Sequence, residues 1–333
     1  TFPTTPPTPP RLPPLRRLAA RCMRSPLGGV VAALVIIFGV SCLLSPHFLT
    51  SFNLMIMARA LAFIGLVTIG QSVLMILGEL DLSVGAIGGL AGITGGMLMV
   101  QAGLDPWLSL GLCLLLGTLC GMLNGVLITR LRLHSLVLTI GMAGVYGGAN
   151  LVVTKGVAIT GVPGDISFLG RGVVYGVPVP FLILLACLGV VGFVMSRTPV
   201  GRYVYAIGSN PEAARMLGLR VDAIRVAAFA TAGFLSALAG ILMVARLGTA
   251  QPSIGDTWVL APIAAAVIGG VATTGGLGSP GGAVLGAVII GIIENIIVLF
   301  GISPYWQSIV SGGIVVLAIS FDSLARRYIH RDA

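Results

Sequence analysis

Charged residues are scarce in this chain. Only 9% of its 333 residues are Asp, Glu, Lys or Arg, whereas 56% are hydrophobic. A soluble globular domain carries about 25% charged residues, so this composition excludes an ordinary water-exposed surface. The mean hydropathy of +1.07 indicates a chain that lies mostly in a lipid bilayer. The net charge of +9 does not indicate nucleic-acid binding, because the basic residues lie at the ends of apolar runs, where they act as topology signals.

Residue types that carry catalysis are also few. The one lysine, Lys155, lies in VVTKGV, which is not the GxxxxGK[ST] loop that holds ATP phosphates. The three histidines, His47, His134 and His330, are scattered, and no HExxH or GxSxG motif occurs. The five cysteines show no CxxC spacing, which disfavours a metal site or a disulfide. We therefore expect no catalytic residue, no metal site and no cofactor in this chain.

Long apolar runs are what the sequence has instead. A transmembrane helix needs about 20 apolar residues, and ten runs approach this length: 27–44, 54–77, 84–101, 107–128, 134–154, 179–196, 226–247, 257–273, 281–300 and 305–322. The predicted fold class is an all-α polytopic membrane protein with about ten transmembrane helices. The stretch VATTGGLGSPGG interrupts 257–273 and 281–300, so either run is a candidate re-entrant segment.

Three regions follow from this division. The membrane domain is expected to cover 27–325. Before it lies a Pro-rich and then Arg-rich tail at 1–26, which we expect to be disordered. A short tail at 326–333 follows it.

The basic residues indicate the orientation of the spans. Cytoplasmic loops carry an excess of Lys and Arg. Placing both termini in the cytoplasm leaves only four of the 19 basic residues outside: Arg59, Lys155, Arg171 and Arg246. We therefore predict cytoplasmic termini and a cytoplasmic loop at 197–225. Arg59 and Arg246 either snorkel from the outer ends of spans or meet an acidic docking protein.

The three tryptophans lie near predicted outer boundaries. Trp107, Trp258 and Trp306 are therefore expected to act as interfacial anchors.

The chain also resembles itself weakly. GELDLSVGAIGGL around Gly78 is similar to GGLGSPGGAVLGA around Gly275, with Gly85-Ala86 falling on Gly282-Ala283 and Gly89 on Gly286. Interrupted helices in weak repeats line the substrate path of many transporters. Chance similarity in a chain with 48 glycines is the alternative. The sequence leaves open whether such repeats run parallel or inverted.

Polar residues inside the apolar runs are the candidates for a substrate pathway. A carboxylate in the membrane is costly unless it faces water or a partner, which singles out Glu79 and Asp81. We expect Asp81 to cap a helix that begins near Leu82, with Ser83 in its first turn; Ser279-Pro280 forms a similar pair. The alternative is that Asp81 only caps a helix near the interface and that Glu79 is solvated. The remaining candidates, which either pack helices together or line the path, are Gln71, Asn124, Glu294 and Asn295.

The most distinctive polar segment is the loop 197–225, which reads RTPVGRYVYAIGSNPEAARMLGLRVDAIR. Asn210 is a good N-cap, Pro211 suits the first helical position and Glu212 opposes the positive end of the helix dipole. Gly218 suits the left-handed residue just past a helix end. The pattern predicts a two-turn helix over Pro211–Leu217, about 10 Å long. A membrane protein that builds such a helix in its cytoplasmic loop presents it to a soluble partner.

These segments resemble a known family. Glu212-Ala213-Ala214-x-x-x-Gly218 is similar to the EAA–Gly loop of bacterial ABC importer permeases. GELDLSVG at 78–85 resembles a motif of the ribose, arabinose and galactose-type sugar permeases. GRYVYAIGSNPEAARMLGL at 201–219, GGVATTGGLGSPGGAVLGA at 269–287 and GISPYWQSIVSGGIVVLAISFD at 301–322 are similar to further segments of that family. Two departures are visible: Glu79 stands where many relatives differ, and the usual continuation after the EAA–Gly loop is missing.

The resemblance implies an ABC importer permease fold in the bacterial inner membrane. It implies a homodimer, a periplasmic sugar-binding protein outside and a tandem-cassette ATPase inside that binds ATP and Mg²⁺. The predicted helix would lie in a groove of that ATPase. The residues it assigns to coupling are Gly201, Arg202, Asn210, Glu212, Ala213, Ala214, Arg215 and Gly218.

The resemblance makes a pentose or hexose the expected cargo. A nucleoside or a furanone-type signal is an alternative cargo for the same fold. An autonomous secondary transporter that uses Glu79, Asp81 or Glu294 as a proton or cation relay is an alternative from another class. A membrane scaffold without transport is a third.

Overall fold

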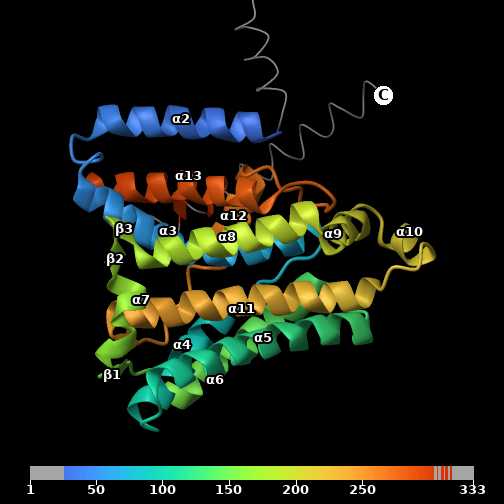
Figure 1. The fold of residues 1–333 in the computed structure, drawn as a ribbon, viewed down its shortest axis with the longest axis horizontal. Coiled ribbons are helices and arrows are strands. Elements are labelled where there is room, and N and C mark those ends of the chain that lie inside the picture. The colour runs from blue at the N-terminus through green and yellow to red at the C-terminus, as the bar shows by residue number, and fades with distance from the viewer. Residues whose placement is uncertain (1–25, 304–305, 307–308, 311, 314–315, 317–333) are drawn as a thin grey trace, which may run out of the picture.

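The computed structural model describes residues 26–303, 306, 309–310, 312–313 and 316 (Figure 1). The tail predicted at 326–333, nearly all of the tail predicted at 1–26 and most of the apolar run 305–322 lie outside the described residues.

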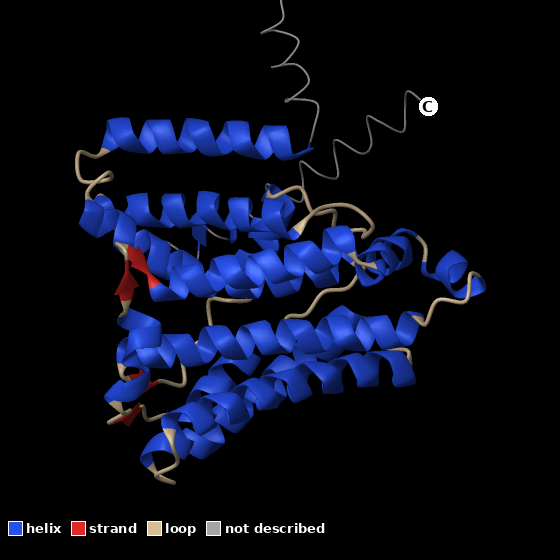
Figure 2. Cartoon of the chain, viewed as in Figure 1, coloured by secondary structure: helices blue, strands red, loops and turns tan. Residues whose placement is uncertain are grey.

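Helices make up most of the described chain, and strands are limited to two-residue pairs (Figure 2). The fold class predicted from the sequence, an all-α polytopic membrane protein, is confirmed. The helices are α2 (Pro26–Leu44), α3 (Ser51–Ile76), α4 (Val84–Val100), α5 (Pro106–Leu131), α6 (Ser135–Thr154), the 3-10 helix η1 (Gly164–Ile166), α7 (Ser167–Arg171), α8 (Val179–Arg197), α9 (Pro199–Ser209), α10 (Pro211–Met216), α11 (Val221–Leu247), α12 (Leu260–Ile268) and α13 (Pro280–Leu299). Strand β1 (Ile159–Thr160) pairs with β4 (Thr249–Ala250), and β2 (Val173–Val174) pairs with β3 (Val177–Pro178), both antiparallel.

The helices differ in their ability to cross a membrane. Among the described residues, α3, α5, α6, α8, α11 and α13 are long and apolar enough to span it. Helix α12 has only 9 residues and is about 13 Å long, less than half of a hydrocarbon core of about 30 Å. The run 257–273 is therefore not a continuous span, because irregular segments flank α12 on both sides. This favours the re-entrant alternative for 257–273, and the predicted number of ten spans is not confirmed.

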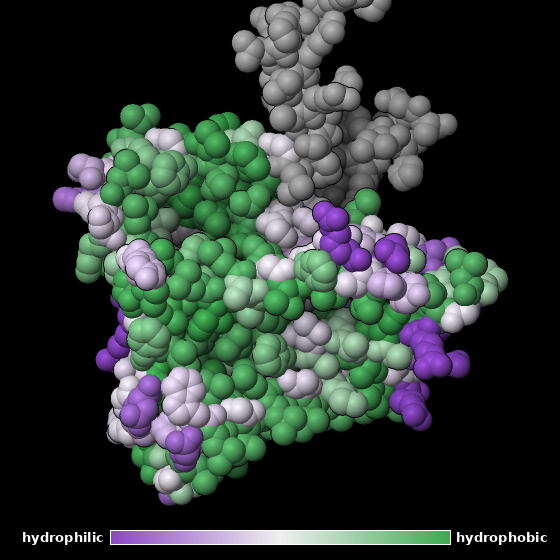
Figure 3. All heavy atoms as spheres, in the orientation of Figure 1, coloured by the Kyte–Doolittle hydropathy of each residue, from purple (hydrophilic) through white to green (hydrophobic). Residues whose placement is uncertain are grey.

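The long helices run side by side, and their ends form two polar faces (Figures 1 and 3). In Figure 3 a hydrophobic belt crosses the middle of the molecule and hydrophilic residues gather at its two ends. One end carries α7 and the strands, and we name it the α7 end. The opposite end carries α9 and α10, and we name it the α10 end.

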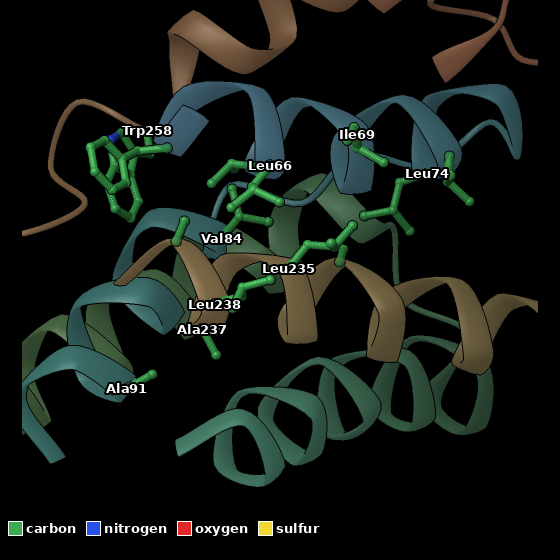
Figure 4. Packing of buried hydrophobic residues seen from close by; sticks show 14 of the residues in the cluster. Leu66, Ile69, Leu74, Val84, Ala91, Leu235, Ala237, Leu238 and Trp258 are labelled. Carbon is green, nitrogen blue, oxygen red and sulfur yellow. The ribbon is translucent and has the colours of Figure 1, made fainter. Parts of the chain in front are cut away.

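Helices α3 and α11 form the antiparallel centre of the bundle. Near the α7 end, the guanidinium of Arg246 in α11 lies 5.5 Å from the ring centroid of Phe63 in α3. Near the α10 end, Arg225 in α11 contacts Glu79 just after α3. Side chains such as Leu66 and Leu235 fill the space between these helices (Figure 4).

Glycines allow the helices to approach closely. A Cβ added at Gly233 of α11 would clash with the backbone of Gly117 in α5. Small residues let helices pack through backbone contact, which is a main source of helix association where lipid replaces water. The backbones of α5 and α11 are therefore in direct contact.

Helices α3 and α11 run antiparallel, and the segments that follow them meet. A Cβ added at Gly85 would clash with Gly255, and one added at Gly255 would clash with Gly85. The short stretches Ser83-Val84-Gly85 and Ser253-Ile254-Gly255 are similar in sequence. Gly85 and Gly282, which the sequence aligns, each lie in the first turn of a helix, α4 and α13, and their equivalence stays a prediction.

Trp258 corrects another expectation. It is only 3% exposed and belongs to the same buried cluster as Leu66 (Figure 4). A Cβ added at Gly88 would be 3.0 Å from its ring, so this glycine makes room for the indole. Trp258 is a core residue and not an interfacial anchor, whereas Trp107 and Trp306 are more than half exposed.

Candidate functional site

The first feature of the site is the break between α3 and α4. Helix α3 ends at Ile76, and Gly78 adopts φ +84°, a value that favours glycine. Two hydroxyl groups of α6 satisfy the backbone of the break: Leu80 N donates to Ser135 Oγ at 3.3 Å, and Leu82 N donates to Thr139 Oγ1 at 3.1 Å. Irregular backbone at membrane depth requires such internal partners, because lipid offers none.

Asp81 is the buried centre of the break. Its Oδ1 accepts hydrogen bonds from Ser83 N at 2.7 Å and from Ser83 Oγ at 2.6 Å. The amide of Asn124 in α5 lies 2.8 Å from Ser83 Oγ and 3.4 Å from Asp81 Oδ2. Both Asp81 and Asn124 are 0% exposed. The predicted cap is wrong in detail: α4 begins at Val84, and Asp81 forms a turn before it instead of capping it.

Tyr146 extends this polar network to α6. Its hydroxyl lies 3.0 Å from Asn124 Oδ1 and 3.1 Å from the carbonyl oxygen of Cys120, and can donate to either. Sequence reasoning missed this residue, although a tyrosine within an apolar run needs a partner for its hydroxyl. The Asp81, Ser83, Asn124 and Tyr146 side chains thus join the break, α5 and α6.

Glu79 forms an ion pair with Arg225. The Oε1 of Glu79 and the Nε of Arg225 are 2.6 Å apart, and the side chains are 10% and 18% exposed. Arg225 Nε makes no well-oriented hydrogen bond, so the contact is electrostatic. Glu79 is therefore not a freely solvated carboxylate. Because Arg225 lies in the first turns of α11, the pair ties the break to the loop that carries α10.

A cavity of about 940 Å³ adjoins this ion pair at the α10 end. Its lining comes from the break, the end of α5 and the residues that connect it to α6, the first residue of α6, α10 and the start of α11. Its charged side chains are Glu79, Arg130, Arg132, Arg215, Asp222 and Arg225, with His134 beside them.

The loop 197–225 folds as α9 and α10, and the predicted cap is confirmed. Asn210 Oδ1 accepts hydrogen bonds from Glu212 N at 3.1 Å and Ala213 N at 2.9 Å. Helix α10 begins at Pro211 and ends at Met216, one residue before the predicted end. Gly218 has φ +79°, and its N donates to Arg215 O at 2.9 Å, closing the helix.

The residues predicted for coupling divide into buried and exposed groups. Ala214 is 2% exposed, and Gly201 is buried where a Cβ would clash with the Met195 backbone. Arg202, Glu212 and Arg215 are exposed. Arg215 also pairs with Asp222 at 2.9 Å. Two apolar residues at the tip of α10, Met216 and Leu217, are 84% and 80% exposed; sequence reasoning did not single them out.

Helix α9 contacts the end of α3, where the break begins, and the segment between α12 and α13. A Cβ added at Gly208 would clash with the carbonyl oxygen of Ile76, the last residue of α3. Gly276 N, in the segment between α12 and α13, donates to the same oxygen at 2.8 Å. Tyr205 OH donates to Gly278 O at 2.8 Å, and burial raises the pKa of this tyrosine, which keeps the hydroxyl protonated. Helix α9 is therefore in direct contact with the end of α3 and with the segment before α13.

The other predicted pathway residues lie apart from Asp81. Gln71 in α3 is fully buried, and neither its Nε2 nor its Oε1 has a hydrogen-bond partner among the described residues. Asn295 in α13 exchanges hydrogen bonds with Asn53 in α3 at 2.8 and 3.0 Å. Glu294 and Asn295 line a separate cavity of about 150 Å³ between α3 and α13. The structure therefore brings together Glu79, Asp81, Ser83 and Asn124, and places Glu294 and Asn295 elsewhere.

The α7 end carries three arginines in contact. Arg59 Nη2 donates to Arg171 O at 3.0 Å, and Arg171 Nε donates to Arg246 O at 2.6 Å. Within the described residues, no ion pair joins these guanidinium groups to a carboxylate. They form a concentrated positive patch, which differs from isolated side chains that snorkel to an interface.

Comparisons with known proteins match this chain to permeases whose names give different transported compounds. Residues 54–319 match a protein family described as "Branched-chain amino acid transport system / permease component". The ribose import permease protein RbsC of Bacillus subtilis is 36% identical over 299 residues, which cover 89% of this chain and 92% of that protein. RbsC of Haemophilus influenzae is 34% identical over 87% of this chain and 91% of its own length. The autoinducer 2 import system permease protein LsrC of Yersinia enterocolitica is 35% identical over 80% of this chain and 74% of its own length. No solved structure matches the chain.

Proposed function

The chain belongs to the family of branched-chain amino acid transport system permease components, and on that premise we propose that it is the membrane-spanning subunit of an ATP-driven bacterial importer of a monosaccharide. The observation that carries this proposal is the extent of the likeness to ribose import permeases, which covers 89% of the chain. That span includes both the intramembrane break at 77–83 and the loop at 197–225.

A separate tandem-cassette ATPase is the proposed source of energy. It docks at the α10 end, which we assign to the cytoplasm on the distribution of basic residues. The capped helix α10 offers exposed Glu212 and Arg215 to set the docking register. The exposed apolar pair Met216 and Leu217 offers a surface that the ATPase covers.

Two contacts carry motion from α10 to the membrane interior in this proposal. The first is the packing of Gly208 in α9 against the last carbonyl of α3. The second is the ion pair of Arg225 with Glu79. Both act on the break that holds Asp81. Coupling needs two global states that the partners bias differently, here a passage open to one side or to the other.

A periplasmic sugar-binding protein is the proposed partner at the α7 end. The positive patch of Arg59, Arg171 and Arg246 is suited to an acidic surface on that protein. A second copy of this chain is proposed to complete the passage, as the family resemblance implies.

Neutral polar groups favour a sugar as the cargo. Gln71 is buried with both polar atoms unpartnered within the described chain, and a polar ligand in a second state would satisfy them. The Asp81 carboxylate is already bonded to Ser83, and Glu79 is paired with Arg225. The break therefore lacks a free opposite charge for the ammonium and carboxylate groups of an amino acid.

Autoinducer-2 is a second candidate cargo, favoured by the likeness to LsrC over 80% of this chain. Uptake of labelled ribose into proteoliposomes that hold the chain, its ATPase and its binding protein separates the candidates. The proposal expects ribose uptake that excess unlabelled ribose abolishes and excess valine leaves unchanged. If only valine competes with the labelled ribose, the cargo is a branched-chain amino acid and not a sugar. If autoinducer-2 competes at a concentration far below that of ribose, autoinducer-2 is the favoured cargo.

A further inference from the structure

The cavity at the α10 end contains more positive charge than its carboxylates neutralise. Each of its two carboxylates forms an ion pair with one arginine: Glu79 with Arg225 at 2.6 Å and Asp222 with Arg215 at 2.9 Å. The side chains of Arg130, Arg132 and His134 line the same cavity, and none of them has an ion pair or a hydrogen bond within the described chain.

Helix electrostatics do not account for this arrangement. A cation in the last turn of a helix is stabilised by the helix dipole, which explains Arg130 at the end of α5. It does not explain why Arg132 and His134 face the same cavity as Arg215 and Arg225, which come from α10 and α11. Cations from separate elements around one concave space form an anion site.

The remaining lining indicates which anion fits. Arginine matches the geometry of phosphate oxygens. Ser135 accepts a hydrogen bond from Leu80 N through its Oγ and keeps its own proton to donate. The carboxylates of Glu79 and Asp222 can accept hydrogen bonds from hydroxyl groups of a ligand, because an ionised carboxylate has more acceptor sites than one arginine contact uses. No Phe, Tyr or Trp lines the cavity among the described residues, so a base has no stacking platform, and Ile128 and Leu133 are too few to hold a lipid tail.

We propose that this cavity binds a phosphate monoester of a small polyhydroxy compound, such as a sugar phosphate. Arg130 and Arg132 on one wall hold the phosphate, and the carboxylates and Ser135 hold hydroxyl groups. A cavity of about 940 Å³ accommodates a ligand of that size. A ligand that bridges α5 and α11 holds the walls of the cavity together and slows transport; this consequence rests on the proposed function. The class of reaction that makes such a ligand is the phosphorylation of the imported sugar.

Direct binding tests the site without any partner protein. The full chain, in nanodiscs of phosphatidylcholine alone, is titrated with ribose 5-phosphate, with ribose and with inorganic phosphate by calorimetry. We expect ribose 5-phosphate to bind, inorganic phosphate to bind more weakly, and ribose to give no signal that depends on Arg130 or Arg132. Raising the salt concentration should weaken binding, which gives a readout that needs no variant.

Two double variants make the comparison specific. Arg130→Gln with Arg132→Gln should weaken binding of ribose 5-phosphate at least about tenfold, since hydrogen bonds to charged groups are lost. Arg197→Gln with Arg220→Gln removes two exposed arginines of the same end that do not line the cavity, and should leave binding unchanged. The site is refuted if both double variants weaken binding of ribose 5-phosphate equally. It is also refuted if neither salt nor the Arg130→Gln, Arg132→Gln variant changes that binding.

Two further experiments follow. The first distinguishes a lipid phosphate from a soluble phosphate ester, and the second tests whether the bound ligand slows transport. If no soluble ester binds in phosphatidylcholine nanodiscs, and phosphatidic acid binds the wild type but not the Arg130→Gln, Arg132→Gln chain, the site is a lipid headgroup site and the sugar phosphate is refuted. In reconstituted vesicles, ribose 5-phosphate on the α10 side should slow uptake by the wild type and not by the Arg130→Gln, Arg132→Gln chain. An unaffected wild-type uptake rate, with binding intact, refutes the inhibitory effect; absence of uptake under all conditions bears on the proposed function instead.

Discussion

Gly208 gives the sharpest test of how α9 is connected to the membrane interior. A methyl group at this position would clash with the carbonyl oxygen of Ile76 and would lie 2.7 Å from Gly276 N. Both are backbone atoms, which cannot rotate away as a side chain would. Overpacking of this kind costs about 1–3 kcal/mol. We therefore expect Gly208→Ala to separate α9 from the end of α3.

The matched control is Gly189→Ala in α8. Nothing lies within 4 Å of an added Cβ at Gly189, and replacing a helical glycine by alanine alone stabilises a helix by up to about 1 kcal/mol. Relative to this control, Gly208→Ala should lower the stability of the purified chain by about 1–3 kcal/mol, measured by thermal unfolding in detergent.

The transport assay distinguishes coupling from general damage. Because Gly208→Ala leaves the exposed tip of α10 unchanged, the ATPase should still co-purify with the chain and hydrolyse ATP. Sugar uptake per ATP hydrolysed should fall, whereas Gly189→Ala should behave as wild type. If Gly208→Ala transports normally and unfolds at the same temperature as Gly189→Ala, then α9 does not act on α3 through this contact.

Three further predictions concern the break and the loop. Glu79→Gln leaves Arg225 charged and mostly buried, so it should cost up to about 3 kcal/mol of stability; the Glu79→Gln, Arg225→Gln chain should regain part of it, and strictly additive losses in a double-mutant cycle would argue against the pair. Asp81→Ala removes the acceptor of two Ser83 hydrogen bonds and should lower uptake while ATP hydrolysis and ATPase binding persist; unchanged uptake would limit Asp81 to a local structural role. Gly218→Pro forces φ from +79° to about −65° and should abolish ATPase co-purification while membrane insertion stays normal; retained co-purification would count against α10 as the docking helix.

Features encoded by neighbouring residues were predictable from the sequence. The cap of α10 depends on Asn210, Pro211 and Gly218, all within one short segment, and the structure has the predicted geometry. The long apolar helices were also predictable, because a single run of residues determines each one.

Features that depend on contacts between residues far apart in the sequence could not be predicted from it. Nothing near Glu79 in the sequence indicates that Arg225 is its partner. The contact of Gly85 with Gly255 joins two segments far apart in the sequence, which no local pattern indicates. Trp258 was expected at an interface because it lies near the predicted outer boundary of the run 257–273, and the structure buries it in the core beside the short α12 instead.

Uptake with and without the ATPase distinguishes an ATP-driven permease from an autonomous transporter. Vesicles that contain this chain, the binding protein and labelled ribose are compared with vesicles that also contain the ATPase, with ATP supplied only on the α10 side. Ribose should accumulate against its gradient only when ATPase and ATP are both present. Accumulation by the chain alone in response to a proton gradient would show instead that it is an autonomous transporter that needs no ATPase.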